Sequence, residues 1–230
     1  VGENKVSVEF TPADQSLNRR DEFLYTLLVP DRARTAFPCF DQPDMKSLFT
    51  LTLEVPEAWQ AVTNGAIEKT DTLSVPGRKL ISFRETEPLS TYLFAFTAGK
   101  FIRETYTRDG REISLYHRET DPKKVAQCPE IASEVFGALT WLEDYTAIPY
   151  PFAKYDLIIL PGFQFGGMEH TGATFYTDRR MFLNENPTLN EQLSRSALIA
   201  HETAHMWFGD YVTMQWFDDV WTKEVFANYF

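Results

Sequence analysis

The stretch LIAHETAHMWFGDY, residues 198–211, constrains the fold of this chain more than any other feature. His201 and His205 lie four positions apart, with Glu202 directly after the first histidine. Residues at i and i+4 occupy one face of an α-helix, so both imidazoles can point at a common ion. The stretch therefore predicts a helix with a polar, metal-binding face.

This arrangement is the HExxH pattern of zinc peptidases. The alternative is a helix whose histidines are solvent-exposed and bind no ion. Apolar neighbours on the same face would bury it, and these are Ala197, Leu198, Ala204 and Phe208. Buried imidazoles and a buried carboxylate need partners, which a metal ion supplies. We expect His201 and His205 to bind zinc and Glu202 to act as the general base toward a zinc-activated water.

A hydrolytic zinc site takes three protein ligands and keeps one position open. Glu224 follows His205 after eighteen intervening residues and is the candidate third ligand. Taken alone it would be interpreted as a solvated glutamate next to Lys223, but its spacing from HExxH favours the metal. Asp218 or Asp219 can cap the helix that carries Glu224. Asp219 could instead orient a ligand histidine.

The pattern of apolar residues divides the chain into two regions and predicts an α+β protein. Residues 1–102 contain short apolar or alternating runs separated by turn signals, which indicate a β-sandwich or saddle-shaped β domain. The expected strands include KVSVEF (5–10), FTLTLEV (49–55), KLISF (79–83) and YLFAFTA (92–98). Residues 103–230 mix strands with helices and are expected to form a second domain.

In this second region, EISLYHR (112–118), KYDLIILPG (154–162) and TGATFYT (171–177) indicate strands. A helix is expected where Ile131, Val135, Leu139 and Leu142 keep helical spacing.

The HExxH helix should begin at Thr188, which forms a capping box with Glu191, and should stop at Gly209. Three tryptophans are expected to pack the metal helices together, namely Trp207, Trp216 and Trp221.

Composition excludes several classes of protein. The chain has 230 residues, 43% of them hydrophobic, which is enough for a real core, and its formal net charge of −11 argues against nucleic-acid binding. No stretch approaches the ~20 apolar residues of a membrane helix, and no signal peptide is visible. Cys39 and Cys128 are expected to be buried free thiols. The cellular compartment stays open.

Three ordered motifs resemble the gluzincin zinc aminopeptidases, the family of aminopeptidase N and leukotriene hydrolase. The first is HETAH with its downstream glutamate. The second, GGMEH (166–170), is similar to the family's GxMEN motif and lies about thirty residues upstream of the zinc helix. The third, ARTAFPCFDQPDMKSLFTLTLEVP (33–56), is similar to the core of the family's N-terminal β domain. The resemblance implies part of that domain at 1–102 and part of a thermolysin-like catalytic domain at 103–230.

The resemblance also implies the same three Zn²⁺ ligands and the same base, in an aminopeptidase that removes N-terminal residues from peptides. It implies that Glu169 binds the free α-amine of the peptide. Gly166 and Gly167 would leave the backbone open for a substrate strand to pair along the loop.

The chain departs from the family pattern at four positions. His170 replaces the Asn of GxMEN, and Lys223 and Val225 replace the Asn and Gly around the third ligand. Val29 stands where the family has a second amine anchor, Gln or Glu. Amine recognition would then rest on Glu169.

Members of this family also have a tyrosine that stabilises the oxyanion and a helical C-terminal domain, both of which would lie past Phe230. We therefore expect a fragment that is weakly active or inactive without the remaining C-terminal part of the protein. Two alternatives stay open. One is a non-peptide hydrolase of the same family, such as an epoxide hydrolase relative, and the other is a noncatalytic binding module that retains the fold.

Overall fold

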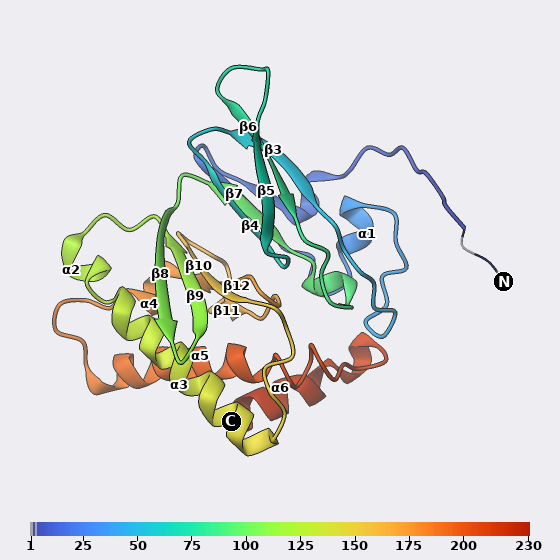
Figure 1. The fold of residues 1–230 in the computed structure, drawn as a ribbon. Coiled ribbons are helices and arrows are strands. Elements are labelled where there is room, and N and C mark those ends of the chain that lie inside the picture. Colours follow the sequence, from blue (N-terminus) through green and yellow to red (C-terminus); the bar gives the residue numbers. More distant parts are fainter. Residues whose placement is uncertain (1, 3) are drawn as a thin grey trace.

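The computed structural model describes residues 2 and 4–230, and its first part is β-rich (Figure 1). Two sheets form this part, a four-stranded sheet in the order β1-β2-β7-β4 and a three-stranded sheet in the order β3-β6-β5. The strands are β1 (Leu17–Arg19), β2 (Phe23–Thr26), β3 (Thr52–Pro56), β4 (Gln60–Thr63), β5 (Ile67–Thr72), β6 (Arg78–Phe83) and β7 (Phe96–Gly99). Short helical turns accompany them at η1 (Asp14–Ser16), α1 (Ala33–Ala36) and η2 (Thr91–Leu93).

The two sheets share one apolar core. Val55, Ile81 and Phe83 come from the three-stranded sheet, and Ala61 and Ala98 come from the four-stranded sheet. Alternate residues of β6 are buried, as expected for a strand with one face against a second sheet. The β-rich first part expected from the sequence is therefore confirmed.

Two expected strands differ in the structure. Residues 5–10 form no strand, and Val6 and Val8 are 83% and 54% exposed. Alternation in the sequence was not enough there, because a strand also needs a neighbouring strand to complete its hydrogen bonds. The start of YLFAFTA is the 3₁₀ turn η2, and the strand β7 begins only at Phe96.

The second part is built on a five-stranded sheet in the order β11-β12-β10-β9-β8. Its strands are β8 (Ile102–Arg108), β9 (Arg111–His117), β10 (Tyr155–Leu160), β11 (Gly167–Met168) and β12 (Thr174–Thr177). The three central strands are parallel, whereas β8 and β11 are antiparallel edge strands. The proposed division between residues 102 and 103 falls at the start of β8.

Helices cover the lower face of this sheet in Figure 1. The helices of this part are α2 (Pro122–Val125), α3 (Cys128–Thr146), α4 (Asp178–Met181), α5 (Leu189–Ala204), η3 (Phe217–Asp219) and α6 (Val220–Tyr229), and of these α3, α4 and α5 contact the strands. The expected helical face of α3 is buried, and its Ile131 and Leu139 share a core with Ile199 of α5 and Leu157 of β10. No helix in the described part of the chain has both the length and the apolarity to span a membrane.

Helix α5 begins as expected but ends early. Thr188 accepts from the backbone N–H of Glu191, and the Glu191 carboxylate accepts from the backbone N–H of Thr188, which is the predicted capping box. The helix ends at Ala204, and His205 is its C-cap residue, so the predicted stop at Gly209 is wrong. Tight turns follow the helix, and in them the N–H of Asp210 donates to the carbonyl of His205 at 3.1 Å.

Of the three tryptophans expected to pack the metal helices together, one is buried. Trp207 is 2% exposed, and its indole N–H donates to the carbonyl of Ile148 at 3.0 Å. Trp216 and Trp221 are 43% and 60% exposed, so neither packs the two helices together.

Both cysteines are free thiols, as expected, but only Cys128 is fully buried. Burial raises the pKa of the Cys128 thiol to about 12 and that of Cys39 to about 11, which makes both weak nucleophiles.

Asn64 ties the β-rich part to the loop between β11 and β12. Its side-chain amide donates to the carbonyls of Leu93 and Thr171 at 2.8 and 2.9 Å and accepts from the N–H of Ala95 at 2.8 Å. Gly172 in that loop has φ +70°, and a Cβ there would overlap the carbonyl of Asn64. The loop is thus held close to the first part of the chain.

We expect Asn64→Ala to lower the free energy of unfolding by about 3 kcal/mol, because it leaves three buried backbone groups without a partner. Urea denaturation measures this change. Asn190→Ala, at an exposed position of α5, is the control and should change stability by no more than about 0.5 kcal/mol. Equal, small effects for the two variants would contradict the role given to Asn64.

Candidate metal centre

Three side chains from α5 and α6 bring their donor atoms to one point. His201 Nε2 and His205 Nε2 are 3.1 Å apart. The Oε2 atom of Glu224 lies 3.5 Å from the first nitrogen and 3.6 Å from the second. Zinc bonds of about 2.0–2.1 Å in a tetrahedron place neighbouring donors roughly 3.4 Å apart. The donor set therefore fits a single zinc ion.

The early end of α5 orients His205. Its Nδ1 lies 3.1 Å from the carbonyl oxygen of Phe208, in the turn after the helix. When Nδ1–H donates to this oxygen, the lone pair of Nε2 is left facing His201 and Glu224. His205 keeps helical angles, φ −56° and ψ −27°, so the i, i+4 relation with His201 is retained.

Glu202 lies beside the three donors without joining them. It is 4% exposed, and its carboxylate faces Gly167 on the edge strand β11. A Cβ at position 167 would overlap the carboxylate of Glu202. Any larger residue at this position would displace the Glu202 side chain, so glycine keeps this acid in place where the strand passes over it. Glu202 also forms a close cluster with Glu169 and His205, in which the donor atoms lie within 4.8 Å of one another.

Glu169 forms a buried ion pair with Lys223. The two side chains are 5% and 6% exposed, and Oε1 of Glu169 accepts from Nζ of Lys223. The same Nζ lies 2.9 Å from Oε1 of Glu224. Glu224 therefore pairs with the lysine through one oxygen and faces the histidines through the other.

Sequence reasoning missed this role of Lys223, which it treated only as a departure beside the third ligand. The residue lies on the inner face of α6, one turn before the buried Ala227. That i, i+4 relation is the signal in the sequence that would have indicated a buried lysine.

The carboxyl groups around the candidate centre differ in their pKa values. Burial, reinforced by the charge of Glu169, raises the pKa of Glu202 well above its usual value. Burial also acts to raise the pKa values of Glu169 and Glu224. At Glu169 the charges of Lys223 and His205 outweigh this effect of burial, and the pKa is lowered. At Glu224 hydrogen bonds with the two histidines and the charge of Lys223 outweigh it, and the pKa is lowered as well. Both of these carboxylates are therefore anionic.

Asp210 adds a further buried acid. It is 1% exposed, and neither carboxylate oxygen has a hydrogen-bond partner among residues 2 and 4–230. Burial raises the pKa of Asp210 well above its usual value. Lys46 donates to the backbone carbonyl of Asp210, at 2.5 Å, not to its side chain. The raised pKa favours the neutral form of Asp210, as it does for Glu202. The anionic Glu169 and Glu224 share the single positive charge of Lys223, so one net negative charge remains beside the histidines, and a dication suits it.

The centre opens into a hollow of about 510 Å³. Gly166, Gly167 and Glu169 line it together with the three donors, so the structure brings together every site residue expected from the sequence. Val29, at the position of the expected second amine anchor, lines the same hollow. Ala197 is exposed and Leu198 half-buried, because they line its wall. The expectation that they bury the metal face is wrong.

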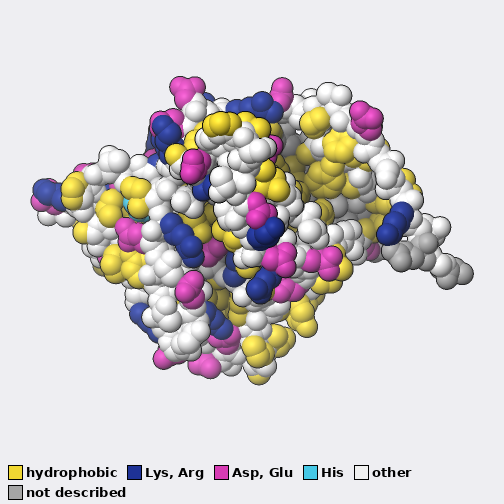
Figure 2. All heavy atoms as spheres, turned by 45° about the horizontal axis from the view of Figure 1, so that its top comes forward, with side chains coloured by type: hydrophobic (Ala, Val, Ile, Leu, Met, Phe, Trp, Pro, Cys, Tyr) yellow, Lys and Arg dark blue, Asp and Glu magenta, His cyan; other side chains and the backbone are white. Residues whose placement is uncertain are grey.

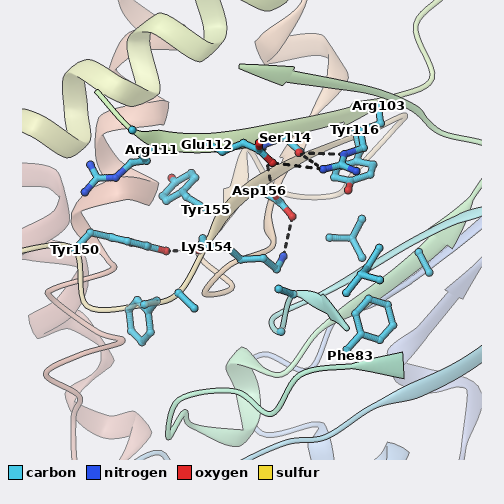
Figure 3. Close-up of a pocket in the computed structure, with 18 of the residues that line it drawn as sticks. Phe83, Arg103, Arg111, Glu112, Ser114, Tyr116, Tyr150, Lys154, Tyr155 and Asp156 are labelled. Atoms are coloured by element: carbon cyan, nitrogen blue, oxygen red, sulfur yellow. Dashed lines mark hydrogen bonds and ion pairs between the residues drawn. The ribbon is translucent and has the colours of Figure 1, made fainter. Parts of the chain in front are cut away.

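A larger hollow of about 730 Å³ lies elsewhere, between the β-rich part and the second sheet (Figure 3). Several of its charged groups are already paired. Lys154 donates to Asp156 at 2.8 Å, and Arg103 donates to Ser114 at 3.0 Å. On the face drawn in Figure 2, acidic and basic side chains are interspersed. The hollow at the histidines is therefore the candidate functional site, because zinc donors and a further buried carboxylate converge on a hollow that is open to a substrate.

Two further residues near the centre are Asp219, a candidate helix cap, and His170, which replaces the Asn of the family motif. Asp219 precedes α6 but makes no side-chain capping hydrogen bond. His170 is fully buried, with its ring edge-on to Phe175 at 4.6 Å between centroids. Within the described part of the chain, neither ring nitrogen of His170 has a hydrogen-bond partner.

Comparison with known proteins gives consistent matches. Residues 12–93 match the family model described as the Peptidase M1 N-terminal domain, and residues 132–230 match that of the Peptidase family M1 domain. The chain is 33% identical to glutamyl aminopeptidase of Sus scrofa over 203 residues, 87% of this chain. It is 36% identical to aminopeptidase M1-A of Oryza sativa subsp. japonica and 34% identical to aminopeptidase N of Streptomyces lividans, over 89% and 90% of this chain.

The matched region is a small share of each relative. It spans 21% of the porcine protein, 23% of the rice protein and 24% of the bacterial one. The chain therefore corresponds to between a fifth and a quarter of the length of these relatives.

We expect Lys223→Met to lower the free energy of unfolding by about 3–5 kcal/mol, because it leaves Glu169 buried without its cation. Adding Glu169→Gln to this variant should recover at least about 1 kcal/mol of the free energy of unfolding, because the double variant no longer buries an unpaired charge. Denaturant unfolding of the single and double variants measures this coupling. The exposed pair of Lys123 with Glu185 provides the control, and Lys123→Met should cost less than about 1 kcal/mol. Strict additivity at Lys223 and Glu169 would contradict the pairing.

His170 should make the protein sensitive to acid. Burial, with a smaller effect of Lys223 and against the charge of Glu169, lowers the pKa of His170 from 6.5 to about 4. The unfolded chain binds the proton first as the pH falls, so stability decreases between about pH 6.5 and pH 4. The parent protein should lose free energy of unfolding between about pH 7 and pH 4.5. We expect this loss to be smaller by about 2–3 kcal/mol in His170→Asn, which lacks the imidazole. Urea titrations in EDTA test this, and parallel pH profiles for the two proteins would contradict it.

Proposed function

The chain belongs to peptidase family M1, and from that premise we propose that it carries the catalytic centre of a zinc-dependent aminopeptidase. The substrates are peptides with a free N-terminus, from which single residues are removed. One observation carries the proposal. A set of donors for zinc, a separate buried carboxylate and a second carboxylate paired with an ammonium group all face one hollow.

His201, His205 and Glu224 are the proposed zinc ligands. When bound, zinc supplies Lewis acidity toward water and toward the scissile carbonyl group. Lys223 orients the third ligand, because it holds Oε1 of Glu224 at 2.9 Å and leaves Oε2 toward the histidines. The carbonyl of Phe208 orients His205 in the same way from the other side.

Glu202 is the proposed general base. Its carboxylate is buried beside the donors, so it can accept a proton from the attacking water at one oxygen and pass it to the leaving amine. Gly167 lets β11 pass directly over this carboxylate. Because β11 is an edge strand, a substrate backbone can pair along it and place its scissile bond near Glu202.

Glu169 is the proposed site for the substrate α-ammonium group. A carboxylate fixed near the metal sets the cut one residue from the N-terminus, because the charged amine reaches it only in that register. Lys223 already pairs with this carboxylate, so an incoming amine has to share it. Lys223 keeps its second partner, Glu224, when that happens. Since Val29 offers no charge at the position of the second anchor, recognition of the substrate amine rests on Glu169.

We expect Glu202→Gln to lower kcat on an aminoacyl anilide by about 10²–10⁴-fold while one equivalent of zinc stays bound, because the variant removes only the base. The test uses the intact protein, with zinc content measured alongside turnover. Chelation of the metal should abolish turnover in the parent, and added zinc should restore it. Undiminished activity of Glu202→Gln would contradict the proposed role.

Two further variants sharpen the result. Glu169→Gln should raise KM for substrates with a free amine more than it lowers kcat. An unchanged KM in Glu169→Gln would contradict the proposed binding of the amine and would favour a hydrolase that acts on substrates without a free amine. Glu185→Gln, at an exposed position far from the donors in sequence, should leave both constants unchanged.

A further inference from the structure

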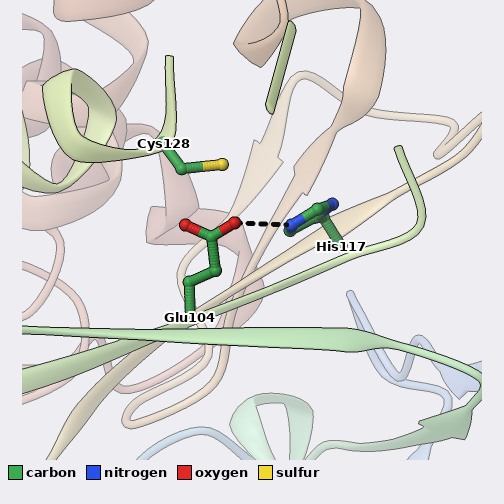
Figure 4. A group of neighbouring side chains, drawn as sticks. All are labelled: Glu104, His117 and Cys128. Carbon is green, nitrogen blue, oxygen red and sulfur yellow. Dashed lines mark ion pairs between the residues drawn. The ribbon is translucent and has the colours of Figure 1, made fainter. Parts of the chain in front are cut away.

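A second cluster of donor atoms lies on elements that carry none of the zinc ligands proposed above. Glu104 of β8, His117 of β9 and Cys128 of α3 each direct one donor atom to a common point (Figure 4). These donor atoms all lie within 4.8 Å of one another. His117 Nε2 is 3.5 Å from Oε1 of Glu104.

Strand register and helix packing bring the three residues together. Glu104 of β8 pairs with Leu115 of β9, and His117 lies two residues further along β9. Residues two apart on a strand share a face, so Glu104 and His117 are diagonal neighbours on one side of the sheet. Helix α3 covers that side and begins at Cys128.

His117 is a buried side chain with an unmet requirement. It is 0% exposed, and among residues 2 and 4–230 neither of its ring nitrogens has a hydrogen-bond partner. The edge-on ring of Phe182, at 5.7 Å between centroids, offers no acceptor or donor. Buried polar groups in proteins are nearly always satisfied, so an unpartnered imidazole aimed at a carboxylate and a thiol points to a ligand between them.

Glu104 is already oriented for such a ligand. The Tyr106 hydroxyl donates to Oε2 of Glu104, which leaves Oε1 facing His117. The Glu104 side chain is 28% exposed, whereas His117 is completely enclosed. The cluster is therefore open to solvent on the side of the carboxylate.

We propose that Glu104, His117 and Cys128 bind a second zinc ion, distinct from the ion at the HExxH helix. A thiolate, an imidazole and a carboxylate are the three ligand types that zinc accepts, and the thiolate disfavours magnesium and calcium. On binding, the Cys128 thiol releases its proton to solvent and its sulfur bonds the ion. One thiolate and one carboxylate charge then offset the two charges of zinc.

The proposed ion has a structural role. It links the β8–β9 hairpin to the first residue of α3 and adds to the apolar contacts and to the Arg108–Ser133 and Arg111–Glu143 hydrogen bonds between the hairpin and this helix. Burial and the charge of Glu104 raise the pKa of the Cys128 thiol, and the partial positive charge at the N-terminus of this long helix acts against them. Water reaches the remaining coordination position from the side of Glu104.

Cobalt substitution distinguishes the two metal sites, because only the second contains a sulfur ligand. We expect the intact protein, loaded with Co²⁺, to show a thiolate-to-cobalt charge-transfer band. Cys128→Ser and His117→Phe should each abolish the band and reduce bound zinc by one equivalent. Cys39→Ser is the matched control and should leave both unchanged. His205→Ala should lose the other equivalent of zinc and keep the band.

If the variants at the buried Cys128 and His117 do not fold, Glu104→Gln still tests the proposal, because the Glu104 side chain is partly exposed and its replacement disturbs the fold less. It should retain the Tyr106 hydrogen bond and weaken cobalt binding by at least about tenfold, because it removes a charged ligand. The absence of a charge-transfer band in the parent protein would overturn the proposal. So would a band that persists in Cys128→Ser, or cobalt affinity unchanged in Glu104→Gln.

Discussion

The arrangement of α5, α6 and the edge strand β11 depends on how the carboxyl groups buried between them are paired with positive charge. Glu169, Glu202 and Asp210 are buried, and Glu224 is half-buried beside two histidines. The Lys223 ammonium group pairs with Glu169 and Glu224, and its single charge offsets only one of these two anionic carboxylates. Taking charges out of water is costly unless opposite charge accompanies them. The proposed zinc ion would offset the negative charge that remains beside the histidines, and the proposed aminopeptidase chemistry depends on it.

The fold holds this cluster by contacts that lie outside it. The capping box at Thr188 fixes where α5 begins, and the turn after Ala204 fixes the ring of His205. Asn64 holds the loop beyond Glu169 against the β-rich part of the chain. Lys46 reaches from that same part to the carbonyls of Asp210 and Tyr211. The two parts of the chain therefore jointly position one hollow, although the proposed ligands all come from the second part.

The proposed second zinc site differs from the first in what surrounds it. The HExxH donors open into a hollow that can admit a substrate. His117 and Cys128 are both fully buried, between the sheet and α3. Accessible donors beside a free carboxylate suit catalysis, whereas enclosed donors with a thiolate suit a structural ion. The same sheet thus joins a proposed reactive centre near β11 to a proposed structural one at β8 and β9.

Local pattern in the sequence was sufficient to predict the α+β class, the helix at 131–142, the capping box and the motif residues. These depend on spacing along one helix or strand, which the sequence states directly. The convergence of Glu224 with the two histidines also followed, because a resemblance supplied the long-range spacing. Residues 5–10 show the limit of local pattern, since their alternation fits a strand that finds no partner.

Only the tertiary structure decided which charges meet. Lys223 is next to Glu224 in sequence, but its pairing with Glu169 spans 54 residues. The cluster of Glu104, His117 and Cys128 combines a hairpin register with the place where a helix begins, and no spacing in the sequence encodes it. The environment of a charged group is set by everything that packs around it, from any part of the chain. The sequence determined which chemical groups this protein has, and packing determined their partners.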